Sequence, residues 1–173
     1  MKKIFLFPVF LAIATLSCAQ NQEIFSKWSI GTSLTYPLQG IYMLQLNYRP
    51  THNHEFFIGP CFQNFGHESF KVNAYTLLLG YRYYIWKGLH VESEVYPAYN
   101  NIYSKITQTR FPGFEMWAEI KIGYQINLFK NRFFIQPAPG IGFGIFQTNK
   151  PPNFDQEINY PVFTPQIIIG ARL

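Results

Sequence analysis

The stretch that decides the fold is residues 74–99, which read AYTLLLGYRYYIWKGLHVESEVYPAY. Alternate positions separate into two faces, as they do in β-strands, where successive side chains point to opposite sides of the sheet. One face carries the large apolar residues Tyr75, Leu77, Leu79, Tyr81, Tyr83, Ile85, Leu89, Val91, Val95 and Pro97. The other carries the strand charges Arg82, Glu92 and Glu94, together with His90. Between the strands, Trp86-Lys87-Gly88 is a short loop ending in glycine, which predicts a β-hairpin.

This hairpin also predicts a register. Residues opposite each other in an antiparallel pair point to the same side of the sheet. The loop places Ile85 opposite Leu89. Arg82 then lies opposite Glu92, and Glu94 lies opposite a glycine. We therefore expect an arginine and a glutamate side by side on the charged face.

The N-terminal segment has the pattern of a secretory signal peptide. The basic pair Lys2-Lys3 precedes an apolar run that is too short for a comfortable membrane-spanning helix. Small residues at Ser17-Cys18-Ala19 then supply a cleavage site. We expect residues 1–19 to be the signal peptide and residues 20–173 to be the folded domain.

Two cysteines bear on processing and redox chemistry. Cys18 leaves open the alternative of lipoprotein processing, with acylation at that residue. The only other cysteine in the sequence is Cys61, so no disulfide framework is expected in the mature chain.

The composition is unusual for a soluble protein. Charged residues make up 13% and aromatic residues 19% of the chain, against about 25% charged in an average globular domain. After the N-terminal segment, apolar residues alternate with polar ones and form no continuous apolar helix. This combination indicates a membrane β-barrel, in which lipid takes the place of a core. The basic residues that give a net charge of +5 are scattered, so no nucleic-acid partner is expected.

Alternation along the whole chain predicts an all-β, transmembrane, antiparallel up-and-down barrel of about eight strands. They are expected near residues 27–36, 42–49, 56–63, 75–85, 89–99, 115–128, 133–145 and 163–173. Long connections are expected at one end, at residues 64–70, 100–112 and 147–160, and short ones at the other, at residues 50–53, 86–88 and 129–132. Outer-membrane barrels have long loops outside and short turns inside, so both chain termini are expected in the periplasm.

Two arguments place the apolar face outward. An eight-stranded barrel has an interior just wide enough to be filled by side chains, and the large apolar residues would overfill it. The outward positions also carry no charge, and a charged residue facing lipid at the bilayer midplane costs about 2–4 kcal/mol. One feature conflicts with strand assignment, because proline has no N–H for the ladder. Five prolines fall inside the expected strands: Pro60, Pro97, Pro137, Pro139 and Pro165.

Five charged residues are expected to point into the lumen: Arg82, Glu92, Glu94, Glu119 and Lys121. A buried charge is tolerated only when it is paired. We therefore expect a structural ion-pair network that fills and rigidifies a closed interior. The alternative is a narrow polar conduit.

The chain resembles the small eight-stranded outer-membrane β-barrels of Gram-negative bacteria, of the OmpA-like and OmpX-like type. The resemblance is carried by the end of the signal peptide, the hairpin LLLGYRYYIWKGL and the closing strand FTPQIIIGARL. The alternating apolar residues of that strand look like the C-terminal signal read by the barrel-assembly machinery: Phe163, Ile167, Ile169, Ala171 and Leu173. Family members more often end in Phe than in Leu. The resemblance implies outer-membrane lipid and the assembly machinery as partners.

No catalytic, cofactor-binding or metal-binding residues are predicted. His67-Glu68-Ser69 contains the residue types of a catalytic triad, but three adjacent side chains do not converge on one substrate atom. His52 and His54 are too few to form a structural zinc site.

The expected function is that of a non-enzymatic outer-membrane barrel with a plugged polar lumen. It would act through its external loops or as an accessory subunit of a larger outer-membrane complex, with Phe111, Phe114 and Phe154 as candidate contacts. The alternatives are an enzyme that modifies outer-leaflet lipid and a small channel.

Overall fold

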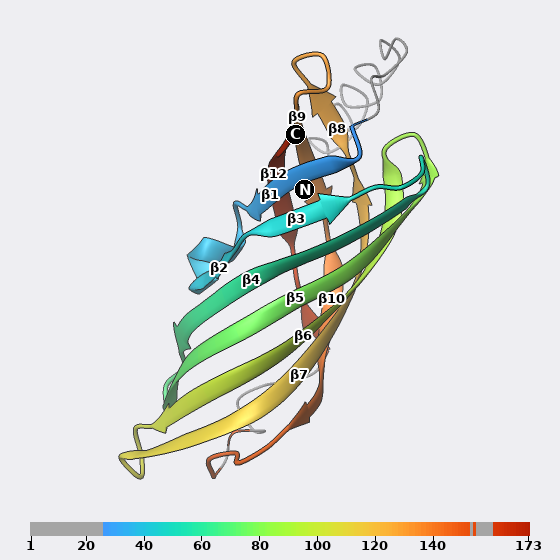
Figure 1. Ribbon diagram of the computed structural model, residues 1–173. Helices are drawn as coiled ribbons and strands as arrows, with labels where there is room; N and C mark the ends of the chain where they lie inside the picture. The colour runs from blue at the N-terminus through green and yellow to red at the C-terminus, as the bar shows by residue number, and fades with distance from the viewer. Residues whose placement is uncertain (1–25, 153, 155–160) are drawn as a thin grey trace, which may run out of the picture.

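A computed structural model describes residues 26–152, 154 and 161–173, which form an antiparallel β-sheet curled into a barrel (Figure 1). The expected signal peptide and Cys18 lie outside the described residues. Within the described part of the chain, no helix is long and apolar enough to cross a membrane.

The strands are β1 (Trp28–Ser33), β2 (Ile41–Met43), β3 (Gln45–Tyr48), β4 (His54–Gly66), β5 (Phe70–Trp86), β6 (Leu89–Ser104), β7 (Thr109–Tyr124), β8 (Ile126–Leu128), β9 (Phe133–Ala138), β10 (Gly140–Gln147), β11 (Val162–Phe163) and β12 (Gln166–Arg172). A short 3₁₀ turn, η2 (Tyr36–Gln39), follows β1. The all-β antiparallel expectation is confirmed. The expected number of about eight strands is corrected, because the sheet contains twelve strand segments.

The larger number arises because four passages of the chain are interrupted. Single residues separate β2 from β3, β7 from β8 and β9 from β10, and two separate β11 from β12: Leu44, Gln125, Pro139 and Thr164-Pro165. Two of these breaks contain proline, which cannot donate to the ladder. Side-chain alternation continues across a break in hydrogen bonding, so the sequence pattern did not reveal the interruptions.

The other strand prolines are accommodated within strands. Pro60 and Pro97 lie in β4 and β6, and the β5–β6 pairing skips Pro97 together with Tyr96. Pro137 lies in β9, paired with Ile167.

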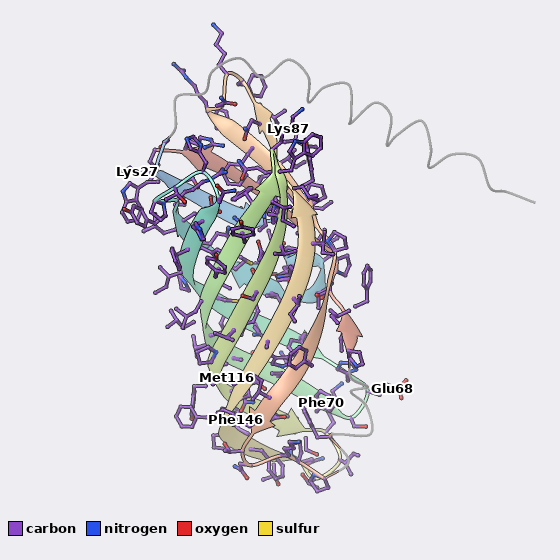
Figure 2. All side chains as sticks on the ribbon, turned by 90° about the vertical axis from the view of Figure 1, so that its right-hand side faces the viewer. Lys27, Glu68, Phe70, Lys87, Met116 and Phe146 are labelled. Atoms are coloured by element: carbon purple, nitrogen blue, oxygen red, sulfur yellow. The ribbon has the colours of Figure 1, made fainter. Side chains whose placement is uncertain are left out.

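The first and last described strands close the wall. β1 pairs with β12 on one side and with β3 on the other. The backbone N–H of Leu173 donates to the carbonyl of Trp28 at 3.0 Å. Figure 2 shows Lys27 at the same end of the barrel as Lys87, which is in the β5–β6 turn, and Glu68 and Phe70 at the opposite end. Both ends of the described barrel chain therefore lie at the end with the short turns.

The central hairpin confirms the predicted register at both inward pairs, Arg82–Glu92 and Gly80–Glu94. The turn itself differs from the prediction, because Leu89 pairs with Trp86. A β-bulge leaves Ile85 out of the pairing, so the loop has two residues instead of three. The bulge absorbs one residue, which is why the register further along the strands is unaffected.

Two of the expected long loops are corrected, because most of their residues are paired strand. The β4–β5 ladder continues to Gly66–Lys71, and the β6–β7 ladder continues to Ser104–Thr109. Strands β4 to β7 therefore project beyond their neighbours at the end opposite the chain termini (Figure 1).

Polarity differs between the two faces of the wall. Along β5, Tyr75, Leu77, Tyr83 and Ile85 are exposed on the outside, whereas Arg82 is fully buried inside. At about 3.3 Å per residue and a tilt of about 40°, the run from Tyr75 to Ile85 rises roughly 25 Å along the barrel axis. That is the height of the apolar band of a membrane barrel.

Aromatic side chains border this band. At one edge, an outward row pairs across four strands: Phe62, Tyr75, Tyr99 and Phe114. The ring centroids of its first two and of its last two members are 5.4 Å apart. Near the other edge, Trp28 and Tyr48 pack with centroids 4.5 Å apart. Such rows are typical of the aromatic girdles at membrane interfaces.

Candidate functional site

All five sequence-predicted lumen residues lie in one cluster inside the barrel. Its first part is centred on Arg82 of β5, which is paired with Glu55 of β4 and Glu92 of β6. Neither the arginine nor Glu92 has any exposed side-chain surface. The side-chain amide oxygen of Gln136, from β9 across the lumen, accepts a hydrogen bond from the Arg82 guanidinium at 2.8 Å.

The second part is centred on Lys121 of β7. Its ammonium group is paired with Glu94, lies 2.6 Å from a Glu119 oxygen and 3.8 Å from the second oxygen of Glu92. Glu92 therefore joins the two parts into a single network. Within the described interior, four carboxyl groups, those of Glu55, Glu92, Glu94 and Glu119, share two cations.

Tyrosine hydroxyl groups supply further donors to these carboxylates. The hydroxyl of Tyr36 donates to Glu119 at 2.8 Å, and that of Tyr96 donates to Glu94. The sequence pattern had placed Tyr36 outward at the end of the first strand. In the structure β1 has ended before it, and η2 turns the side chain into the lumen, where it is 3% exposed.

Three further members of the network were missed from sequence for different reasons. Glu55 has the same parity as the inward residues Phe57 and Gly59, but the expected strand began one residue after it. Gln136 carries no charge to distinguish it. Tyr96 is an aromatic residue on the polar face, and only its carboxylate neighbours indicate its role.

Glycines leave room for the large inward side chains, and a layer of apolar residues packs beside the charged groups. A side chain at Gly80 would meet the ring of Phe57, and one at Gly140 would meet the Lys121 stem and the carbonyl of Ile120. An apolar cluster packs inside the wall beside the network: Tyr36, Met43, Phe57, Cys61, Leu78 and Tyr96, with Ile41 and Trp117 at its edge. Trp117, a large apolar residue in line with the inward Glu115 and Glu119 of β7, therefore packs inside the barrel.

A cavity of about 580 Å³ lies beyond the network, toward the end opposite the chain termini. We call it the mouth cavity. Its lining comes from η2, the far part of β4, β6, β7 and the β11 region: Tyr36, Gln39, Ile41, Cys61, Gln63, Phe65, Gly66, His67, Tyr96, Trp117, Glu119, Val162 and Thr164. Glu119 is the member of the ion-pair network that borders this cavity.

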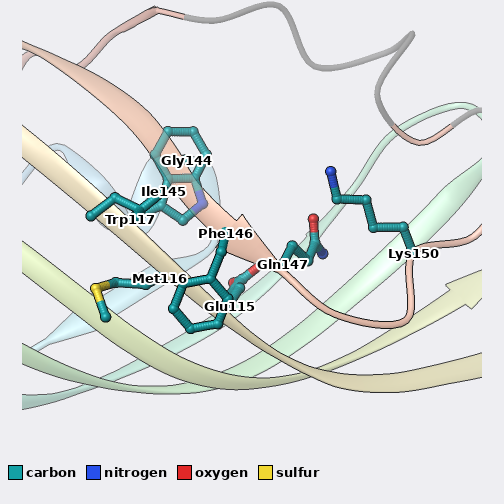
Figure 3. Close-up of a pocket in the computed structure, with 8 residues that line it drawn as sticks. All are labelled: Glu115, Met116, Trp117, Gly144, Ile145, Phe146, Gln147 and Lys150. Atoms are coloured by element: carbon teal, nitrogen blue, oxygen red, sulfur yellow. The ribbon is translucent and has the colours of Figure 1, made fainter.

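A smaller hollow of about 80 Å³ lies in the wall between β7 and β10 (Figure 3). The register between these strands shifts from Gly144 to Phe146, which leaves Ile145 as the extra residue of a β-bulge. The inward Glu115 and the outward Met116 both line the hollow. Trp117 lines it as well and therefore borders both cavities.

The polarity of the wall is reversed beyond the aromatic row. We call this part, residues 63–74 and 100–113, the extension. Its outward face carries two rows of residues that pair across the four strands. The first row is Asn64, Asn73, Asn101 and Pro112, and the second is Gly66, Lys71, Tyr103 and Arg110. Its inward face carries the apolar row Phe65, Val72, Ile102 and Phe111. Since the parity of the strands is unchanged, the outer face itself changes from apolar to polar at this row.

Phe154, from the connection between β10 and β11, covers the inward face of the extension. It is 5% exposed, and its ring centroid lies 4.8 Å from that of Phe70. Phe111 packs at the edge of the same cluster, whereas Phe114 is exposed on the outside. Of the three phenylalanines expected to contact a partner, Phe154 is therefore buried within the chain.

Replacing Phe154 with alanine is expected to loosen the extension without disturbing the ion-pair network. Truncating a buried phenylalanine destabilises a protein by about 3–5 kcal/mol, and here we expect the packing of the cluster around Phe70 to be weakened. Hydrogen exchange followed by mass spectrometry should show at least about tenfold faster exchange in residues 70–74, which corresponds to about 1.4 kcal/mol. Phe114→Ala is the matched control, with unchanged exchange expected. Equal protection in both variants would mean that the strands hold the extension without Phe154.

The remaining sequence candidates do not form a reactive centre. His67 packs on Phe70 with centroids 4.9 Å apart, at a turn where Glu68 is exposed. His54 shares a hydrogen bond of 2.7 Å with the hydroxyl of Tyr81. In residues 26–152, 154 and 161–173, no group of three or more His, Cys, Asp or Glu side chains is arranged to hold a metal ion.

The five residues of the expected assembly signal lie along β11, β12 and the last position of the chain. Phe163, Ile169 and Leu173 are exposed, and Ile167 and Ala171 are half-buried. Their partners are also outward residues, such as Ile141 for Phe163 and Phe133 for Ala171. Recognition of this strand by the assembly machinery stays a prediction.

Comparison with known proteins supports the fold. No protein-family model matches the chain, and no curated protein matches it. Among solved structures, the chain is similar to the N-terminal β-barrel domain of Pseudomonas aeruginosa OprF, with 14% sequence identity and a TM-score of 0.51. The match covers 84% of this chain and 96% of that domain. At this identity the likeness shows a shared β-barrel fold.

Proposed function

We propose that the protein is an integral barrel of the outer membrane, with a closed interior and no enzymatic activity. The observation that carries the proposal is the reversal of polarity across the wall. Large apolar side chains are exposed on the outside over a membrane-sized band, and the charged groups are buried inside. This arrangement is unstable in water but suits a barrel surrounded by lipid. The end bearing the extension faces the exterior, and the chain termini face the periplasm.

The interior network supports a structural role over conduction. Arg82, Lys121 and Glu94 have no exposed side-chain surface, and each is paired with an opposite charge. An open conduit would place such groups in contact with water. We therefore expect no stepwise conductance when the protein is incorporated into planar lipid bilayers.

The extension is the proposed point of action outside the cell. It carries a polar outer face on a sheet stiffened by continuous ladders and an apolar cluster. This form suits contact with a larger membrane protein, to which the barrel would serve as an accessory subunit. Copurification from gently solubilised membranes tests this role, and recovery of the barrel alone would contradict it.

The membrane assignment is tested with the full chain expressed in a Gram-negative host. We expect the protein in the outer-membrane fraction. High salt should not extract it from the membrane, whereas detergent should. In gels it should migrate differently before and after boiling, because folded barrels resist dodecyl sulfate. Recovery as a folded monomer in detergent-free buffer would overturn the proposal. Mass spectrometry of lipid A, with and without the protein, should show no change, and a new lipid species would favour the enzyme alternative.

A further inference from the structure

The mouth cavity has the dimensions and walls of a small-molecule site. Its volume of about 580 Å³ lies within the range of about 300–1,000 Å³ that is usual for ligand pockets. Apolar side chains form much of its wall: Ile41, Phe65, Trp117 and Val162. Such a lining favours a ligand that is mainly apolar.

Polar groups are placed at defined points on this wall. The side chain of Glu119 is 11% exposed, whereas those of Glu92 and Glu94 are 0% exposed. Glu119 is therefore the carboxylate of the network that a ligand can reach. Thr164 also lines the cavity, but its hydroxyl oxygen is buried and does not face the cavity.

The charge of the lining limits which ligands fit. Among the described lining residues there is a carboxylate but no lysine or arginine. Lys121, the nearest cation of the network, is itself fully buried beneath Glu119. A carboxylate or phosphate ligand would therefore meet like charge without a compensating cation.

We propose that the mouth cavity binds a small neutral or cationic amphiphile. Its polar group donates hydrogen bonds to Glu119. Its apolar part packs against Ile41, Phe65 and Trp117. This site goes beyond the proposed membrane role, which would stand even if the cavity bound nothing.

Trp117 provides the reporter for a direct test. The sequence contains three tryptophans, and Trp28 and Trp86 lie on the outer face. The double variant W28F/W86F leaves Trp117 as the sole tryptophan. This protein is placed in phosphatidylcholine nanodiscs and titrated with 10-bromodecylamine, 10-bromodecanol and 10-bromodecanoate, since bromine quenches tryptophan fluorescence on contact. Probe concentrations are expressed per lipid, so that partition into the bilayer does not distort the comparison.

We expect saturable quenching by the amine and the alcohol, with at least about tenfold weaker binding of decanoate, a ratio that corresponds to about 1.4 kcal/mol. Filling the cavity by Val162→Phe should remove saturation, whereas Ile141→Phe, on the outer face, should not. Thr164→Leu is a second filling variant. Glu119→Gln should abolish the preference for the amine while the alcohol still binds.

Two results would overturn the proposal. Quenching that rises linearly with every probe, equally in Val162→Phe and its parent, would mean that the cavity holds no ligand. Decanoate binding as tightly as the amine would refute the predicted charge class. The heat-dependent gel mobility of each sample reports separately whether the barrel is folded, so a failed site is distinguishable from a failed membrane assignment.

Discussion

Replacing Arg82 with methionine is expected to destabilise the folded barrel by about 3–5 kcal/mol, the usual cost of removing one partner of a buried ion pair. The substitution leaves Glu55 and Glu92 facing each other without the cation between them. Lys121 cannot replace it, because its ammonium group is already shared by Glu94 and Glu119. The free energy of unfolding is measured by urea titration of the barrel refolded in detergent, followed by tryptophan fluorescence.

The triple variant R82M/E55Q/E92Q separates the loss of charge from the loss of packing. Neutralising both partners removes the unpaired charges, so this variant should recover much of the stability lost in R82M. Lys71→Met is the control on the same strand, because Lys71 is exposed on the outer face of the extension. We expect it to change stability by less than about 0.5 kcal/mol. A similarly small change in R82M would show that the buried network does not hold the interior together.

Introducing arginine at Ile58 is expected to cost about 2–4 kcal/mol if the outer face meets lipid, the usual cost of a basic residue at the bilayer midplane. Ile58 is exposed on the outer face of β4, midway between His54, where the strand begins, and Phe62 of the aromatic row. In a water-soluble barrel, the same substitution would replace an exposed apolar residue with a polar one and cost almost nothing.

Asn64→Arg provides a matched control six positions along the same face of β4. Asn64 lies beyond the aromatic row, on the polar outer face of the extension, and we expect its substitution to be neutral within about 0.5 kcal/mol. Both variants are unfolded from lipid vesicles in guanidinium, and their free energies are compared with that of the parent. Equal costs at the two positions would mean that the aromatic row does not mark the edge of the membrane.

The sequence determined the features that depend on local alternation and on short turns. A period of two places every charge of residues 75–85 and 89–99 on one face, whichever strands become neighbours. The short Lys87-Gly88 turn sets the pairing of Arg82 with Glu92, and the sequence predicted this contact even though the number of loop residues was wrong. Inward and outward faces could also be separated, because the outward positions of the apolar band carry no charge.

Tertiary structure decided the features that depend on distant partners or on interrupted hydrogen bonding. Tyr36 reaches Glu119, far along the chain, because η2 turns it inward, and no period in the sequence reports such a turn. The strand breaks at Leu44 and Gln125 leave side-chain alternation intact and so leave no pattern to detect. Polar loops and strands with a polar outer face have a similar amino-acid composition, so composition does not distinguish them. Only the tertiary structure shows that the ladders continue through the extension and that Phe154, from a distant connection, covers its apolar side.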